Sequence, residues 1–206
     1  MTIDRITIYG SCASGNCLKV RWVADRLGVA YDWVEVDVVA GGARTEEFLA
    51  INPAGQVPCV VFADGRVLPQ SNAIILYLAE VTASDLIPAD AFARAQMMSW
   101  LFWEQYTHEP AIAVRRFHKA LLGKPDSEID PELLPKGRRA LGVMELQLTY
   151  SEWLVGNGPT LADVALVAYT RVAHEGGFDL SEFPNVQAWV GRVERALDIP
   201  HVQEAA

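Results

Sequence analysis

The chain has 206 residues, of which 51% are hydrophobic and 21% charged, and its formal net charge at pH 7 is −9. This composition supplies a core for one or two domains and excludes a disordered chain. The negative charge, without a block of Lys and Arg, excludes nucleic acid as an expected partner. No apolar run reaches the roughly 20 residues of a membrane span. The first residues do not resemble a secretory signal, so we expect a cytoplasmic protein without a membrane partner.

The first part of the chain alternates strand and helix patterns. Predicted strands cover residues 3–9, 31–36, 59–62 and 66–68, and predicted helices cover residues 45–51 and 71–81. Between the first two strands, an apolar face from Val20 to Leu27 predicts another helix. The last two strands are joined by the turn Ala63-Asp64-Gly65, which suggests an antiparallel pair beside a parallel βαβ unit. We therefore predict a mixed sheet covered by helices.

From about residue 90 the strand signals stop and helical patterns take over, covering about 90–122, 131–154, 160–174 and 185–197. Pro110 is expected to kink or divide the first of these helices. Thr160 and Asp163 form a capping-box variant at the start of the third. The predicted organisation is an α/β domain (1–80), a linker (81–89) and an all-α domain (90–206).

Three cysteines, Cys12, Cys17 and Cys59, occur without CxxC spacing or nearby histidines. This pattern argues against a disulfide framework and against a zinc site, so no metal is expected. We interpret Cys17 and Cys59 as small buried hydrophobic residues.

Four segments resemble the cytosolic glutathione S-transferase family, in the order and spacing of that family: residues 9–21, 52–58, 70–74 and 160–163. The first resembles the serine-type classes, in which the active serine lies six positions before the valine of the first helix, and counting back from Val20 reaches Ser14. The resemblance implies a thioredoxin-like N-terminal domain with a mixed sheet and an all-α C-terminal helical bundle that contributes the electrophile site. It also implies glutathione as co-substrate and a homodimer.

Ser14, taken by itself, reads as a helix N-cap at the carboxyl end of the first strand, where ligands tend to bind in open α/β sheets. The resemblance gives its hydroxyl the task of donating a hydrogen bond to the glutathione sulfur and so favouring the thiolate. Asn16 is a candidate second donor, or else a solvent-facing residue of the first helical turn.

The glutathione-binding residues follow from the same resemblance. A cis peptide before Pro58 would present the backbone of Val57 to the cysteinyl part of glutathione, although an ordinary Xaa-Pro turn is the alternative. Gln70 and Ser71 open a helix and suit the γ-glutamyl carboxylate, with a plain N-cap as the alternative for Ser71. The glycyl end is assigned to two further residues, Arg44 and Gln56.

Other interpretations stay open at this point. Cys12 lies two positions before Ser14 and would be the reactive group of a thiol-disulfide oxidoreductase. Tyr106 and His108 lie in an aromatic stretch that faces the electrophile in the family, although such a stripe also fits a helical core. A non-catalytic carrier of hydrophobic ligands is the remaining alternative to an enzyme.

Overall fold

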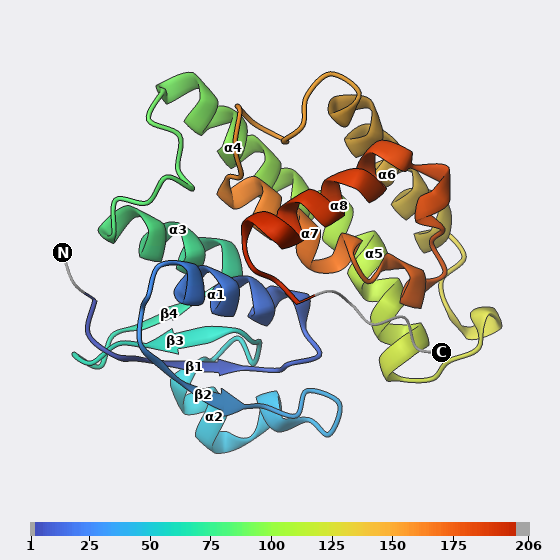
Figure 1. The fold of residues 1–206 in the computed structure, drawn as a ribbon. Coiled ribbons are helices and arrows are strands. Elements are labelled where there is room, and N and C mark those ends of the chain that lie inside the picture. Colours follow the sequence, from blue (N-terminus) through green and yellow to red (C-terminus); the bar gives the residue numbers. More distant parts are fainter. Residues whose placement is uncertain (1–2, 201–206) are drawn as a thin grey trace. The chain divides into compact units, whose positions relative to one another are not determined.

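The computed structural model describes residues 3–200 and divides the chain into two compact units, with the boundary between Ile87 and Pro88. Each unit has its own set of elements (Figure 1). The first is an α/β unit, and the second contains helices but no strand among its described residues. The predicted combination of a thioredoxin-like unit with an all-α unit is confirmed.

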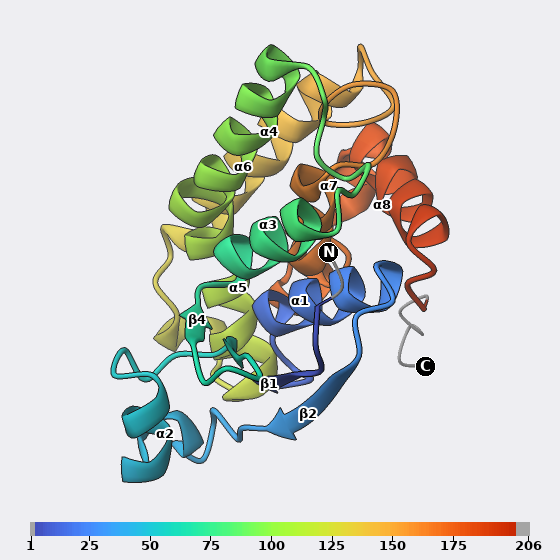
Figure 2. The same cartoon turned by 90° about the vertical axis from the view of Figure 1, so that its left-hand side faces the viewer.

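The elements of the α/β unit are, in chain order, β1 (Ile6–Gly10), α1 (Gly15–Arg26), β2 (Tyr31–Glu35), the 3-10 turn η1 (Gly42–Arg44), α2 (Glu46–Ile51), β3 (Cys59–Val61), β4 (Val67–Pro69) and α3 (Ser71–Val81). The strand order in the sheet is β2-β1-β3-β4. β1 runs parallel to β2 and antiparallel to β3, which in turn pairs antiparallel with β4. Within this unit α1 and α3 cover one face of the sheet and α2 covers the other (Figures 1 and 2). The predicted mixed sheet is confirmed.

Alternating side chains of the strands fill the two faces of this sheet. Ile6 and Ile8 of β1 are fully buried, as are Val20 of α1 and Ile74 of α3. On the face that α2 covers, a separate apolar cluster consists of Val36, Ala43, Phe48 and Cys59, with Tyr9, Ile51 and Val57 packed against it. Cys17 and Cys59 are both fully buried, which confirms their interpretation as small core residues.

The helical unit contains α4 (Ala91–Trp103), the π-helical segment η2 (Glu104–His108), α5 (Glu109–Arg116), a second π-helical segment η3 (Phe117–Leu121), the 3-10 turn η4 (Asp126–Glu128), α6 (Leu133–Leu148), α7 (Leu161–Thr170), the 3-10 turns η5 (Ala173–Gly176) and η6 (Leu180–Glu182), and α8 (Pro184–Ala196). Every residue of α7 is buried. α6 ends at Leu148, whereas the sequence pattern continues to Leu154. The chain turns after Leu148, and the side chain of Ser151 donates to the backbone oxygen of Trp153 at 2.7 Å, a local bond that stabilises the turn.

Pro110 does not divide the long helix: helical residues continue without a break from Ala91 to Leu121, and what changes near the proline is the helical hydrogen bonding. Proline has no N–H to donate to the carbonyl four residues earlier, and its ring collides with that carbonyl. The π-helical segment Glu104–His108 ends just before α5, which carries Pro110 in its first turn. The wider π turn accommodates the proline without ending the helical path.

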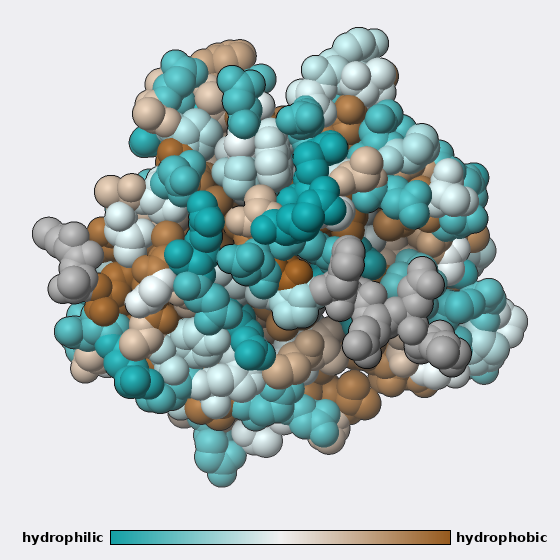
Figure 3. All heavy atoms as spheres, in the orientation of Figure 1, coloured by the Kyte–Doolittle hydropathy of each residue, from teal (hydrophilic) through white to brown (hydrophobic). Residues whose placement is uncertain are grey.

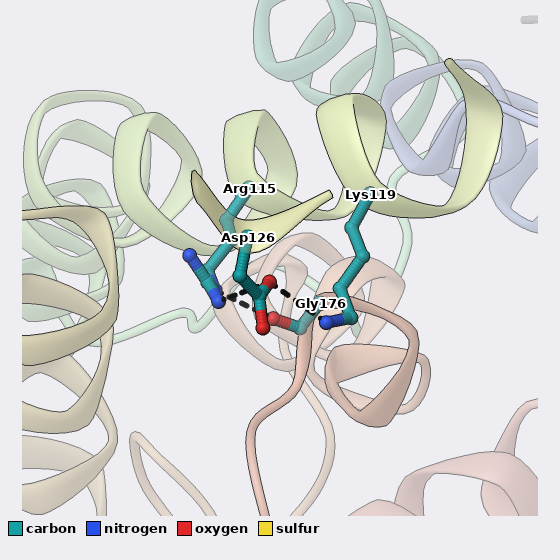
Figure 4. Close-up of polar contacts among 4 residues, drawn as sticks. All are labelled: Arg115, Lys119, Asp126 and Gly176. Atoms are coloured by element: carbon teal, nitrogen blue, oxygen red, sulfur yellow. Dashed lines mark hydrogen bonds and ion pairs between the residues drawn. The ribbon is translucent and has the colours of Figure 1, made fainter. Parts of the chain in front are cut away.

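A charged cluster connects α5, η3, η4 and η5 of the helical unit (Figure 4). Arg115 of α5 is buried; it donates to the backbone oxygen of Gly176 at 2.7 Å and to Asp126 at 2.9 Å. Lys119 donates to the same Asp126 oxygen at 2.8 Å. The two cations hold the pKa of the Asp126 carboxyl below its ordinary value, with the hydrogen bond from Lys119 as the main cause.

None of the helices within residues 3–200 has the length and apolar character needed to cross a membrane. The same part of the chain contains no group of three or more His, Cys, Asp or Glu side chains that could hold a metal ion.

Candidate functional site

Three loops leave the four-stranded sheet at the same end. Cys59, at the start of β3, pairs with Tyr9 near the end of β1 and with Pro69 at the end of β4. The segments that follow β1, precede β3 and follow β4 therefore all lie at the same end of the strands. These three loops carry most of the residues selected from the sequence: Cys12, Ser14, Gln56, Val57, Pro58, Gln70 and Ser71.

Ser14 occupies the N-cap position of α1, with extended backbone angles, as expected. Its backbone oxygen accepts the N–H groups of Cys17 and Leu18, each at 3.0 Å. Its hydroxyl makes no side-chain capping bond in the described part of the chain and instead lies in hydrogen-bonding contact with the thiol of Cys17. The hydroxyl therefore lies at the positive end of a helix without being used to cap it.

Asn16 joins the beginnings of α1 and α3. Its Oδ1 accepts a hydrogen bond from the hydroxyl of Ser71 at 3.2 Å, across 55 positions of sequence. The same atom accepts from Nζ of Lys19 at 2.7 Å. Two helix N-termini therefore meet at this end of the sheet, where backbone N–H groups and dipoles favour an anion.

Lys19 is a polar residue of this region that sequence reasoning missed. Its side chain is fully buried beside Asn16, which places an ammonium group at the start of α1. The available signal was its spacing, because position 19 follows Asn16 by three and therefore lies on the same face of the helix.

The loops that precede β3 and α3 have unusual backbone geometry. The peptide bond between Val57 and Pro58 is cis, as the resemblance predicted. Gln70, at the N-cap of α3, has φ 73° and ψ 113°, angles that favour glycine. Ser71 follows directly and is buried, with its hydroxyl on Asn16.

Arg44 lies against the loop of residues 52–58. A Cβ on Gly55, which has φ +61°, would come within 2.9 Å of the backbone oxygen of Ala43 and still closer to the Arg44 guanidinium, so only glycine fits there. Asn52 is buried and shapes the same loop by donating from Nδ2 to the backbone oxygen of Gln56 at 2.7 Å. The structure thus places Arg44, at the end of η1, against the loop that contains Gln56.

Cys12 is exposed and lies in the loop between β1 and α1. Its backbone N–H donates to the carboxylate of Glu35, at 3.0 and 3.2 Å from the two oxygens. Glu35 is a second residue that sequence reasoning missed. It ends β2, which runs parallel to β1, so the ends of the two strands lie side by side. The other two cysteines are buried, and burial raises the pKa of the Cys17 and Cys59 thiols to about 11.

The two aromatic candidates both lie in the π-helical segment of the helical unit, but in different surroundings. The side chain of Tyr106 is 88% exposed. His108 is fully buried, and its Nε2 lies 2.9 Å from the hydroxyl of Thr170 in α7. The role of either residue toward an electrophile stays a prediction.

Comparisons with known proteins match both units. A family model described as "Glutathione S-transferase, N-terminal domain" matches residues 13–81, and "Glutathione S-transferase, C-terminal domain" matches residues 95–196. "Glutathione S-transferase 3" of Zea mays is 33% identical, over 89% of this chain and 86% of the relative. A crystal structure of glutathione S-transferase from Pseudomonas fluorescens Pf-5 is 44% identical, with a TM-score of 0.88, over 92% of this chain and 94% of the other. Ure2p in complex with glutathione is 26% identical, with a TM-score of 0.85 and coverages of 96% and 98%.

Proposed function

This chain belongs to the glutathione S-transferase family and is a glutathione transferase, and from that premise we propose that Ser14 activates the thiol of glutathione for conjugation to small hydrophobic electrophiles. The observation that carries the proposal is the hydrogen bond between Ser71 and Asn16, which joins the N-termini of α3 and α1 beside Ser14. A bound anionic peptide at this place would have two helix N-termini and a hydroxyl within its reach.

We assign each part of glutathione to one loop. The γ-glutamyl carboxylate binds at the start of α3, to the backbone N–H groups there and to the side chains of Gln70 and Ser71. The cysteinyl backbone pairs with Val57, in the loop that ends at Pro58. The glycyl carboxylate is held by Gln56, in the loop between α2 and β3, and by Arg44 of η1, whose guanidinium lies against Gly55 of that loop. This assignment brings the sulfur to the beginning of α1.

The chemistry at the sulfur needs a thiolate, because the thiol form is a poor nucleophile and an ordinary cysteine thiol has a pKa of about 8.5. The Ser14 hydroxyl donates a hydrogen bond to the sulfur, and the positive end of α1 adds attraction for the negative charge. The thiol proton leaves to solvent. The thiolate forms a carbon–sulfur bond with the electrophile. In a substitution the leaving group departs with the bonding electron pair, and in an addition the π pair moves onto the neighbouring acceptor atom, which takes a proton from solvent. Asn16 as a second donor to the sulfur stays a prediction.

Replacement of one hydroxyl tests this mechanism. Ser14→Ala is expected to lower kcat for conjugation about 10²-fold, as the loss of one oxyanion-type donor does, and to leave the affinity for glutathione nearly unchanged. Steady-state kinetics with an aryl halide and calorimetry with glutathione measure the two quantities. Cys12→Ala is the matched control and should conjugate at the wild-type rate.

The alternatives give different results in the same experiment. Unchanged turnover in Ser14→Ala contradicts the serine mechanism. Loss of all activity in Cys12→Ala favours a thiol-disulfide oxidoreductase. Wild-type protein that binds glutathione without turning over any electrophile would be a carrier.

We also propose a homodimer and a cytoplasmic location, as the family resemblance implies. The dimer proposal is supported by an exposed hydrophobic stripe on the helical unit, made of Phe102, Tyr106, Val143, Leu146 and Tyr150. Tyr106 and Val143 line one cavity of about 400 Å³, which links the two helical segments of the stripe. Contiguous exposed apolar patches on proteins mark sites of association or ligand binding.

A further inference from the structure

The loop that leads into Ser14 is held by a carboxylate of the neighbouring strand. Glu35 accepts the backbone N–H of Cys12 and, at 2.7 Å, the Nε1–H of Trp33. The hydroxyl of Ser11 and the thiol of Cys12 are also in hydrogen-bonding contact with Glu35. The Glu35 carboxylate therefore accepts hydrogen bonds from two successive residues, Ser11 and Cys12, of the loop that leads to Ser14.

The position of Trp33 depends on the absence of a side chain at Gly10. A Cβ at Gly10 would lie 2.7 Å from Cη2 of the Trp33 ring, so glycine is required at the end of β1. The Arg21 guanidinium of α1 covers the other side of this arrangement, 5.9 Å from the centre of the Trp33 ring. Glu35 and Trp33 thus form a fixed support for the loop.

The charge of Glu35 also acts on the Cys12 thiol. Partial burial raises the pKa of Cys12, and the hydrogen bond and negative charge of Glu35 raise it further, while Arg21 of α1 opposes them. Burial acts to raise the pKa of Glu35 itself, but the donors Trp33, Cys12 and Ser11 together hold it below its ordinary value. The carboxylate is therefore ionised at neutral pH, beside an exposed thiol.

We propose that Glu35 is a positioning residue that favours the Ser14 reaction over reaction at Cys12: its hydrogen bonds hold Ser11 and Cys12 in the loop before Ser14, and its negative charge keeps Cys12 as a thiol. The proposal rests on the proposed function of Ser14. The reaction that Glu35 suppresses is attack of a Cys12 thiolate on glutathione disulfide. In that exchange a Cys12–glutathione disulfide forms, the disulfide bond of the reagent breaks, and the second glutathione leaves as a thiolate; the Cys12 proton goes to solvent.

Glu35→Gln in the full chain removes the negative charge but keeps the size of the side chain and an oxygen that can accept the Cys12 N–H. The measurement is the rate of alkylation by iodoacetamide as a function of pH, without glutathione. Cys17 and Cys59 are buried with pKa values of about 11, so the exposed Cys12 dominates the rate, and Cys12→Ser in the same background verifies this. We expect the midpoint of the pH–rate profile at a lower pH and a rate at neutral pH that is about 2- to 4-fold higher.

The matched control is Asp32→Asn, on the same strand. Asp32 pairs with Arg5 at 2.8 Å and makes no contact with Cys12 among the interactions of the described residues, so its variant should keep the wild-type profile. Mass spectrometry after incubation with glutathione disulfide should show more Cys12–glutathione adduct in Glu35→Gln than in wild type or in Asp32→Asn. Identical alkylation profiles for Glu35→Gln and wild type would overturn the charge effect.

Conjugation kinetics test the positioning part. Glu35→Ala removes the acceptor as well as the charge and is expected to lower kcat, and Glu35→Gln should restore most of that loss. Equal kcat in Glu35→Ala and wild type would overturn the positioning role of Glu35. Alkylation is measured without glutathione, so a failure here is distinct from a failure of the proposed function, which would appear as unchanged turnover in Ser14→Ala.

Discussion

Gln70 has backbone angles that a residue with a side chain rarely adopts. Such a conformation costs on the order of 1–3 kcal/mol and persists where the surrounding structure requires it. Gln70 lies between β4 and α3, directly before the buried Ser71 that contacts Asn16. Strained residues cluster at ligand-binding positions, so this geometry agrees with the γ-glutamyl site that we propose at Gln70 and Ser71.

Replacing Gln70 by glycine should affect stability and glutathione binding in opposite directions. Gln70→Gly is expected to raise the free energy of unfolding by about 1 kcal/mol, because relief of strain exceeds the added flexibility of the unfolded chain. The same change should weaken glutathione binding, because the amide is lost. Denaturant unfolding and calorimetry measure the two effects.

Ala83→Gly is the matched control for Gln70→Gly. Ala83 also has positive φ, at 51°, but follows the C-terminal end of α3. It should show the gain in stability with unchanged glutathione affinity. Weaker binding in both variants would assign the effect to helix α3 as a whole and contradict a role for the Gln70 side chain.

At the scale of elements, Asp163 connects α7 to two other parts of the helical unit. The capping box that the sequence predicted is present: Asp163 Oδ2 accepts the N–H and the hydroxyl of Thr160 at 2.8 and 3.0 Å. Its Oδ1 accepts the N–H of Leu154 at 3.1 Å and the indole N–H of Trp189, in α8, at 2.9 Å. One fully buried carboxylate therefore satisfies four donors.

Removing this carboxylate should destabilise the helical unit. Asp163→Ala is expected to lower the free energy of unfolding by about 3 kcal/mol or more, because several buried donors lose their acceptor. Asp163→Asn keeps one acceptor oxygen and should lose less. Asp179→Ala is the control, since Asp179 is an exposed cap that accepts from Ser181, and it should cost about 1 kcal/mol or less. Similar losses in Asp163→Ala and Asp179→Ala by denaturant unfolding would refute the network.

At the scale of the whole molecule, charge and exposed apolar surface decide how copies associate. Hydrophilic residues are spread widely over the face shown in Figure 3, with smaller hydrophobic areas between them. The net charge of −9 opposes non-specific association. The hydrophobic stripe that includes Val143 and Leu146 supports our dimer proposal.

Charged residues introduced into the hydrophobic stripe should dissociate the proposed dimer. The double variant Val143→Glu, Leu146→Glu is expected to be a monomer at micromolar concentration while the wild type is a dimer, because burial of unpaired carboxylates in an interface is costly. Light scattering coupled to size exclusion measures the mass. Val39→Glu, an exposed apolar residue outside the stripe, should remain dimeric. A monomeric wild type would refute the proposal.

The sequence by itself determined the type and order of the elements, because local patterns carry that information. The predicted helix 71–81 matches α3 residue for residue, the strand pattern of β2 begins at Tyr31 as predicted, and the capping box at Thr160 is present. These features depend on the spacing of apolar residues and on helix caps, both of which act within a few residues.

Only the tertiary structure decided which distant groups meet. Ser71 and Asn16 are 55 positions apart, and Glu35 and Cys12 are 23 positions apart. Nothing in a local pattern specifies such pairs, since they depend on strand order and on the packing of α1 against α3. The sequence therefore indicated Ser14 as a candidate. Only the fold decided that Asn16, near Ser14, links the N-termini of α1 and α3, and that the Glu35 carboxylate lies against Cys12.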